Sequence, residues 1–298
     1  MNASDFPEDD YDYCLELLGN LGLPYLGCAS EWRDELESGD WDALFSLLLC
    51  LIPAVQSITV LEYSNAHLSM NSYLEQVLTV ARAIDGSVSL LKLKHVSLSC
   101  NGDCLELGDI APFLALNSVE TFYVEGFYMD QDLSHDFFLH LGQKFRTKEF
   151  HVESGCVSGD DMAKFLKLFP SLRVLHFQHC GFTDDDESLH LFPQKLIEAI
   201  DHLKSCLEVL VASTYNRSMD PVMGSLHEFE VLKDVSLERS LMLGYVEEEF
   251  NVPGSNWEEK EVSNHSAIVE LLPRSLETLK ITGSWQEYDI LQYIAGLL

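Results

Sequence analysis

The hydrophobic positions of this chain follow one frame, which is clearest in residues 165–182. Leu172, Leu175 and Phe177 carry large apolar side chains, and the polar residues His176 and Gln178 follow Leu175 and Phe177. Apolar residues that alternate with polar ones predict a strand with one buried face. The apolar residues before Pro170 recur at helical spacing, so this stretch predicts a helix end, a stop at the proline and a short strand.

The same frame recurs along most of the chain. The apolar triplets are Val55, Ile58 and Val60; Leu93, Val96 and Leu98; Val119, Phe122 and Val124; Thr147, Phe150 and Val152; Leu172, Leu175 and Phe177; Leu207, Leu210 and Ala212; Leu232, Val235 and Leu237; and Leu276, Leu279 and Ile281. Four of the seven intervals between them lie in the range of about 20–29 residues that leucine-rich repeats use. Thr147 is polar where the other triplets begin with an apolar residue, so the register at 147–152 is left open.

Segments with apolar residues at three- and four-residue spacing separate the triplets. One predicted helix begins at Trp41 and stops at Pro53, and the others cover residues 73–84, 110–116, 133–145, 160–169, 188–203 and 266–272. This alternation predicts an α/β leucine-rich-repeat solenoid of about eight irregular repeats, a horseshoe with parallel strands on the concave side and helices on the convex side. A doubly wound sheet is disfavoured because the chain has no Gly-rich first turn.

This pattern divides the chain into three predicted parts. Residues 1–40 are acidic and predicted to be irregular apart from a short helix at 11–18, and their aromatic and leucine residues are expected to cap the first repeat. Residues 41–284 form the predicted repeat domain, which contains an acidic insertion loop at 244–264. Residues 285–298 are predicted to be a C-terminal capping helix.

Three segments resemble fungal F-box and leucine-rich-repeat proteins. WDALFSLLLCLIPAVQSITV is similar to their helix–proline–strand opening, HVSLSCNGDCLELGDIAPFLALNSVETFYVEG to a later unit, and LLPRSLETLKITG to their C-terminal strand. The resemblance covers residues 21–283 and implies a module related to the substrate receptors of ubiquitin ligases. No F-box segment is found in residues 1–50, where Leu23-Pro24 is followed by Tyr25 rather than by an acidic residue.

The net charge narrows the class of partner. The chain has 18 basic and 49 acidic residues, a formal net charge of −31. A field of this sign repels nucleic acid phosphates and anionic lipids, and it attracts basic surfaces. The predicted partner is therefore a protein with a basic surface, and neither a nucleic acid nor a membrane. An acidic surface that only keeps the protein in solution is the alternative.

The cysteines and the N-terminus bear on the compartment. The N-terminal residues are acidic where a secretion signal is basic, and the longest apolar run, residues 43–55, is too short to cross a bilayer. The eight cysteines are therefore expected to be reduced and mostly buried, in a cytoplasmic or nuclear protein. Cys180 falls on the asparagine-or-cysteine position of the repeat frame and is expected to pack under the backbone of the turn.

Candidate binding residues occupy the strand positions that point away from the core, because strand side chains alternate between two faces. The first such row is Thr59, Ser97, Tyr123, His151, His176, Val211, Ser236 and Lys280. The second row is Leu61, Ser99, Glu125, Glu153, Gln178, Ser213, Glu238 and Thr282. Adjacent parallel strands lie about 4.8 Å apart, so neighbouring members of a row are expected to lie side by side.

The centre of these rows suits a partner that carries lysine or arginine side chains, since it combines aromatic rings with carboxylates. The predicted partner-binding residues are Tyr123, Glu125, His151, Glu153, His176 and Gln178. No nucleotide-binding or serine-hydrolase motif occurs, so the predicted function is non-catalytic protein–protein recognition on the concave face, without a cofactor. The alternative is a metal-dependent hydrolase in which His151, His176 and Glu153 bind zinc. The pattern does not indicate an oligomeric state.

Overall fold

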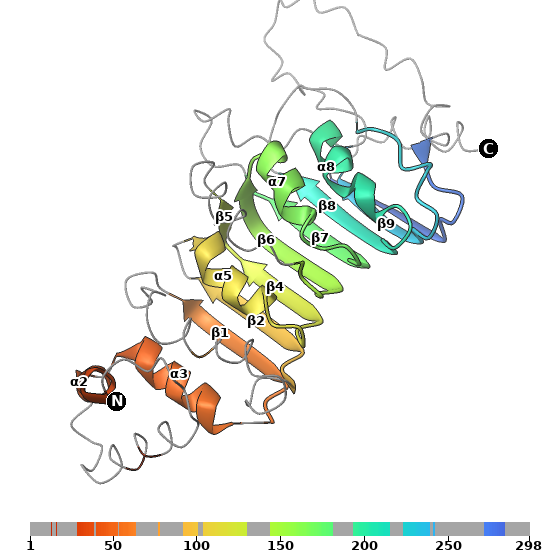
Figure 1. Cartoon of the computed structure of the whole chain (residues 1–298). Coiled ribbons are helices and arrows are strands. Elements are labelled where there is room, and N and C mark those ends of the chain that lie inside the picture. Colours follow the sequence, from red (N-terminus) through yellow and green to blue (C-terminus); the bar gives the residue numbers. More distant parts are fainter. Residues whose placement is uncertain are drawn as a thin grey trace, which may run out of the picture. The chain divides into compact units, whose positions relative to one another are not determined.

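The structure is a computed structural model that describes residues 13, 16, 29–38, 40–52, 54–63, 77, 92–100, 104–129, 144–180, 193–214, 223–238, 241 and 271–283. Ten strands in these ranges belong to one parallel sheet, which is accompanied by few helices (Figure 1). The predicted α/β class is therefore confirmed, and the sheet is compatible with a solenoid. The chain divides into two compact units, residues 1–150 and 151–298.

In the first unit, the predicted core positions of neighbouring strands stand opposite one another. Its strands are β1 (Ser57–Tyr63), β2 (His95–Cys100), β3 (Leu105–Glu106), β4 (Thr121–Glu125) and β5 (Phe127–Met129). Ile58 on β1 pairs with Val96 on β2, which pairs in turn with Phe122 on β4. All three side chains are buried. The short strands β3 and β5 pair with each other beside this path.

Three helices of the first unit are described. They are α2 (Ala29–Ser38), α3 (Trp41–Leu51) and α5 (Leu107–Leu114). The predicted helix from Trp41 to Pro53 is confirmed as α3, and the Asp40 carboxylate caps it by accepting a hydrogen bond from the N–H of Ala43 at 2.9 Å. The prediction of an irregular segment is wrong for residues 29–38. Trp32 and Leu36 lie four residues apart on one face of α2 and are both buried, which is enough to hold an otherwise polar helix.

The second unit continues the same pairing pattern. Its strands are β6 (Glu149–Val157), which begins two residues before the unit, β7 (Val174–His179), β8 (Val209–Thr214), β9 (Asp234–Glu238) and β10 (Thr278–Thr282). Leu175, Leu210, Val235 and Leu279 pair in register along β7 to β10. These residues are the middle members of four predicted triplets, so the frame predicts the register of these strands correctly.

Two helices of the second unit lie side by side, α7 (Gly159–Leu166) and α8 (Pro193–Ile200), and α8 runs on into the short 3-10 helix Asp201–Leu203 (Figure 1). The hydroxyl of Ser158 caps α7 by accepting from the N–H of Asp161 at 3.2 Å, and it donates to the Asp161 carboxylate at 2.6 Å. The helix predicted at 160–169 is therefore present, but it ends three residues earlier, where the chain turns before Pro170.

The hydrophobic core follows the predicted triplets. In every triplet from the one that begins at Leu93 to the one that ends at Leu237, each side chain is at most 2% exposed. Thr147 is fully buried together with Phe150 and Val152. Residues 147–152, whose register the sequence leaves open, therefore fit the frame. The first and last triplets are mostly half-buried, because β1 and β10 are the end strands of the sheet and each has one neighbouring strand.

Several predicted elements lie wholly or largely outside the described residues. They are the helices at 11–18, 73–84, 133–145 and 266–272, the insertion loop at 244–264 and the capping helix at 285–298. In the described ranges, no helix combines the length and the apolar character that crossing a bilayer requires.

Candidate functional site

The polar face of the sheet in the second unit carries the predicted rows of candidate residues. His176, Val211, Ser236 and Lys280 pair in register across four neighbouring strands. Their side chains are half-buried or exposed, whereas the residues on either side of them in the strands are mostly buried. This alternation places the first row on the face opposite the core, as predicted.

Two of the predicted site residues, His151 and His176, contact each other through their rings. Their ring centroids lie 5.8 Å apart, and the ring planes meet at 66°, an edge-to-face arrangement. Glu153 and Gln178 stand two residues further along the same two strands and are also half-buried. The second unit therefore presents two imidazoles, a carboxylate and an amide on rigid strands. All four groups can exchange hydrogen bonds with a partner, and the imidazole faces can stack on one.

Tyr123 and Glu125 belong to the first unit, on β4. Tyr123 pairs in register with Ser97, and both are half-buried. The hydroxyl of Ser99 on β2 donates to the Glu125 carboxylate at 2.6 Å, which holds that carboxylate along the sheet. Tyr123 and His151 belong to different units, so the predicted placement of Tyr123 beside His151 stays a prediction.

The alternative zinc site is not formed in the described part of the chain. No group of three or more histidine, cysteine, aspartate or glutamate side chains there is arranged to hold a metal ion. His151, His176 and Glu153 are all described, and they do not make up the three-ligand set that a catalytic zinc site uses. The contact between the two imidazoles is a ring-to-ring contact.

Charged residues directly precede most strands of the sheet, and in each unit their signs alternate from strand to strand. This row was not predicted. In the first unit the row is Lys94, Glu120 and Lys148, with Glu120 oxygens 3.7 Å from the Lys94 ammonium and 3.3 Å from the Lys148 ammonium. The hydrogen bond and charge of Lys148, followed by the charge of Lys94, lower the pKa of the Glu120 carboxyl. The backbone carbonyl of Glu120 also accepts from the N–H groups of Lys148 and Glu149, at 2.8 and 3.0 Å. We call this row the charge ladder.

The charge ladder has a counterpart in the second unit, where it reads Arg173, Glu208, Lys233 and Glu277. The Arg173 guanidinium donates two hydrogen bonds of 2.8 Å to the Glu208 carboxylate, one to each oxygen. The Lys233 ammonium lies 3.1 Å from Glu277, and that hydrogen bond raises the pKa of Lys233. Each ladder residue directly follows the first member of a triplet, so the sequence signal is an alternation of sign at one position of the frame within each unit.

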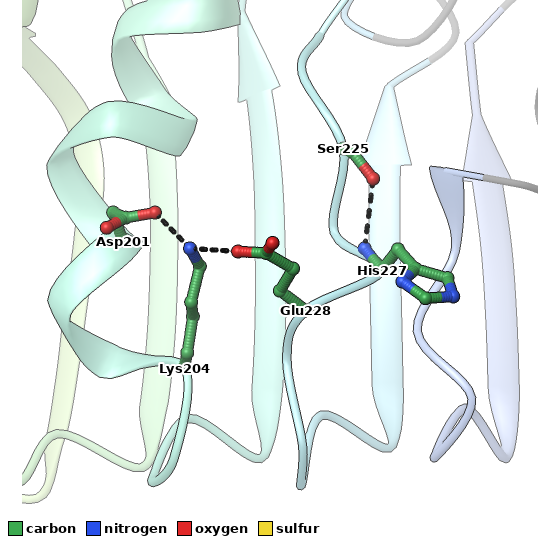
Figure 2. A pocket seen from close by; sticks show the side chains of 5 residues that line it. All are labelled: Asp201, Lys204, Ser225, His227 and Glu228. Atoms are coloured by element: carbon green, nitrogen blue, oxygen red, sulfur yellow. Dashed lines mark hydrogen bonds and ion pairs between the residues drawn. The ribbon is translucent and has the colours of Figure 1, made fainter.

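An open pocket of about 600 Å³ lies in the second unit and was also not predicted. Its lining residues are Asp201, Lys204, Ser225, His227 and Glu228 (Figure 2). Figure 2 shows the Lys204 ammonium between the carboxylates of Asp201 and Glu228, which raise the pKa of Lys204. The charge of Lys204 is therefore already matched within the protein. Because the other four lining residues are exposed, the pocket excludes little water from a ligand.

Comparison with known proteins does not identify a function, so the function is argued from the geometry described above. No protein-family model matches the chain, and neither the curated proteins nor the solved structures give a significant match. The polar face with its histidine pair, the charge ladder and the Lys204 pocket are the features from which an activity can be argued.

Proposed function

We propose that the chain is a leucine-rich-repeat solenoid that recognises a protein partner on the polar face of its sheet, without catalysis. The observation that carries this proposal is the edge-to-face pair of His151 and His176, whose rings lie 5.8 Å apart on adjacent strands and are half-buried. Rings that are already ordered on a rigid surface lose little side-chain entropy on binding, and their faces can stack on side chains of a partner.

The rigidity of the polar face supports binding to a partner of defined shape. His176 belongs to a row whose members pair in register on four strands, and the core residues beneath the row on β7, β8 and β9 are buried. Side chains on such strands are already ordered before binding, so the entropic cost of association is low. The proposed contact residues of the second unit are His151, Glu153, His176 and Gln178.

The charge of the chain supports a basic partner. The net charge is −31, and Glu153 adds a carboxylate beside the histidine pair. Four of the 18 basic residues are paired with carboxylates in the charge ladder, so they offer little positive charge to an acidic partner. An acidic field of this size accelerates the approach of a basic surface and weakens with added salt.

The test is affinity capture from cell extract with the full chain, followed by mass spectrometry. The wild type is compared with a His151→Ala/His176→Ala variant, and circular dichroism establishes that both are folded. A matched control is His227→Ala, which removes an exposed imidazole from the Lys204 pocket instead. We expect a partner that the wild type and His227→Ala retain and that the double variant loses, with retention falling as salt is raised.

Capture of the same proteins by the wild type and the double variant would contradict the proposed site. Tyr123 and Glu125 of the first unit are examined in a separate Tyr123→Ala variant, since they form a second possible contact on β4. The resemblance to F-box and leucine-rich-repeat proteins makes a further distinction possible. Recovery of a ubiquitin-ligase scaffold would extend the proposal to substrate recognition in the cytoplasm or nucleus, and a partner without one would limit it to protein binding.

A further inference from the structure

Two cysteines of the second unit lie near the ends of β6 and β7: Cys156 is the penultimate residue of β6, and Cys180 directly follows β7. The N–H of Cys180 donates to the carbonyl of Gly155 at 2.9 Å. In a parallel sheet, a residue that donates to a given carbonyl is paired with the residue after that carbonyl, as His95 donates to Gln56 and pairs with Ser57. Cys180 is therefore the register partner of Cys156.

A local irregularity in β6 creates this pairing. The repeat frame aligns Val152 with Phe177. If this alignment continued without interruption, Cys180 would pair with Gly155. Ser154 has a left-handed backbone (φ 56°), and the alternation of buried and half-buried residues is interrupted at Ser154 and Gly155. One extra residue in β6 at this point shifts the register by one and brings Cys156 into line, which is the geometry of a β-bulge.

Gly155 is needed for this bulge. A Cβ atom at Gly155 would lie 2.5 Å from Val152 Cγ1 and 3.1 Å from Phe177 Cε2, distances that the packed core does not admit. The glycine therefore lets the backbone of β6 sit against the core while the next residue, Cys156, stays opposite Cys180. The bulge and the pairing of the two cysteines are one feature of the structure.

The two thiols contact each other directly. The Cys156 thiol donates a hydrogen bond to the Cys180 sulfur, and this bond lowers the pKa of Cys180, against the opposing effect of partial burial. Both cysteines are reduced; Cys156 is buried, and Cys180 is half-buried. In-register parallel neighbours have Cα atoms about 4.8 Å apart, within the range of about 4.4–6.8 Å in which disulfides form.

We propose that Cys156 and Cys180 are a peroxide-reactive dithiol that closes to a disulfide between β6 and the end of β7. Cys180, the more exposed of the two, is the residue that reacts with peroxide, and Cys156 is the resolving residue. This site lies beyond the proposed binding function, although it joins the two strands that carry His151 and His176.

The chemistry balances with hydrogen peroxide as the oxidant. The Cys180 thiolate attacks one peroxide oxygen, an S–O bond forms, the O–O bond breaks, and the departing hydroxide takes up a proton to become water. Cys180 is then a sulfenic acid, oxidised by two electrons. The Cys156 thiol transfers its proton to the sulfenic oxygen, and its sulfur attacks Cys180. The S–S bond forms, and a second water leaves. Thiol exchange with a reductant restores both thiols.

The test treats the reduced full chain with about one molar equivalent of hydrogen peroxide, blocks remaining thiols with iodoacetamide and digests the protein with trypsin without reduction. The chain is well suited to this measurement, because Cys156, Cys180 and Cys206 fall on separate tryptic peptides, residues 149–164, 174–195 and 205–217. We expect mass spectrometry to find 149–164 linked to 174–195 as the main product, and to find it lost after dithiothreitol.

Cys206 provides a matched control. It is also half-buried, but its thiol donates to backbone carbonyls, and burial together with the charge of Glu208 raises its pKa. At neutral pH, iodoacetamide should therefore alkylate Cys180 at least about tenfold faster than Cys206. A Cys206→Ala variant should form the 149–164 to 174–195 link as the wild type does.

The Cys156→Ala variant separates the two roles. We expect it to accumulate a Cys180 sulfenic acid, which dimedone traps, and to form no link. Equal alkylation and oxidation of Cys180 and Cys206, or links from 174–195 to other peptides in preference to 149–164, would overturn the proposal. The wild-type digest decides this without any variant, so a folding defect in Cys156→Ala leaves the test intact.

Discussion

Thr147 is a polar residue placed where every other triplet has an apolar one. Its side chain is fully buried, and its hydroxyl has no hydrogen-bond partner among the described residues. A buried hydroxyl without a partner costs about 1–3 kcal/mol relative to an apolar group of the same shape. The frame is therefore strong enough to keep this position in the core against an unfavourable side chain.

Replacing Thr147 by valine should stabilise the protein. Valine has the shape of threonine without the hydroxyl, so we expect Thr147→Val to raise the free energy of unfolding by about 1 kcal/mol in urea denaturation. Thr121→Val is the matched control, because the Thr121 hydroxyl donates to Glu149 at 3.3 Å and its loss should not stabilise. A destabilised Thr147→Val would mean that the hydroxyl is satisfied by a group outside the described residues.

Single residues also mark where prediction from the sequence ends. The frame predicts that Phe177 is buried and His176 is not, because alternation along a strand decides both. It predicts Cys180 as a turn residue packed under the backbone, whereas the structure pairs its sulfur with Cys156. That contact depends on the extra residue at Ser154, and a backbone with positive φ at a serine leaves no signal in the pattern of apolar positions.

At the scale of strands, the charge ladder should contribute stability that depends on pH. Glu120→Gln removes the negative charge between Lys94 and Lys148, which would then repel each other. The folded-state pKa of Glu120 is below its ordinary value of 4.5, so its contribution is complete above pH 4.5 and is lost as pH falls through the folded-state value. We expect a lower Tm than the wild type at pH 7 and a difference that narrows as the pH falls toward and below 4.5.

Glu230→Gln is the control for the ladder, since Glu230 is also exposed but is not a ladder residue. It should leave the Tm close to that of the wild type throughout the pH range. A Glu120→Gln deficit that stays constant with pH would show that the loss comes from packing rather than from charge.

Elements were predicted best where one strong signal governs them. The helix α3 is predicted because a long apolar run ends at Pro53, and the structure adds Asp40 as its cap. The helix α2 was missed because only Trp32 and Leu36 carry its buried face, and the acidic residues around them suggested an irregular segment. The helix α5 begins earlier than predicted, because Glu106 and Asp109 form a capping box at its N-terminus.

Over the whole chain, the excess of negative charge should oppose folding at low ionic strength. With 49 acidic and 18 basic residues, repulsion between carboxylates outweighs the attraction of the ladder pairs, which lie at the surface and are individually weak. Raising sodium chloride from about 0.01 M to about 0.15 M shortens the screening length from about 30 Å to about 8 Å. We therefore expect the Tm to rise with salt.

Tetramethylammonium chloride is the control in this experiment, because it screens charge without coordinating carboxylates. It should raise the Tm by a similar amount, and a rise with sodium alone would indicate cation binding instead. A Tm that falls with either salt would show that the ladder pairs outweigh the net repulsion.

The fold class was predictable at this scale because the same three apolar positions recur and fix both the strands and their register. The division into units 1–150 and 151–298 was not, since the frame runs through the boundary without a change in composition. The candidate site was predictable as a row of polar positions. The edge-to-face contact of His151 with His176 depends on side-chain rotation, which a strand pattern does not determine.

The alternation of sign in the charge ladder also restricts how this sheet can change in length. Removal of the strand that carries Glu120 would bring Lys94 beside Lys148, and removal of the one that carries Lys233 would bring Glu208 beside Glu277. In the second unit, removal of the two neighbouring strands that carry Glu208 and Lys233 would instead bring Arg173 beside Glu277 and keep opposite charges adjacent. Within this unit, the loss of such a pair of strands should therefore cost less electrostatic energy than the loss of a single strand.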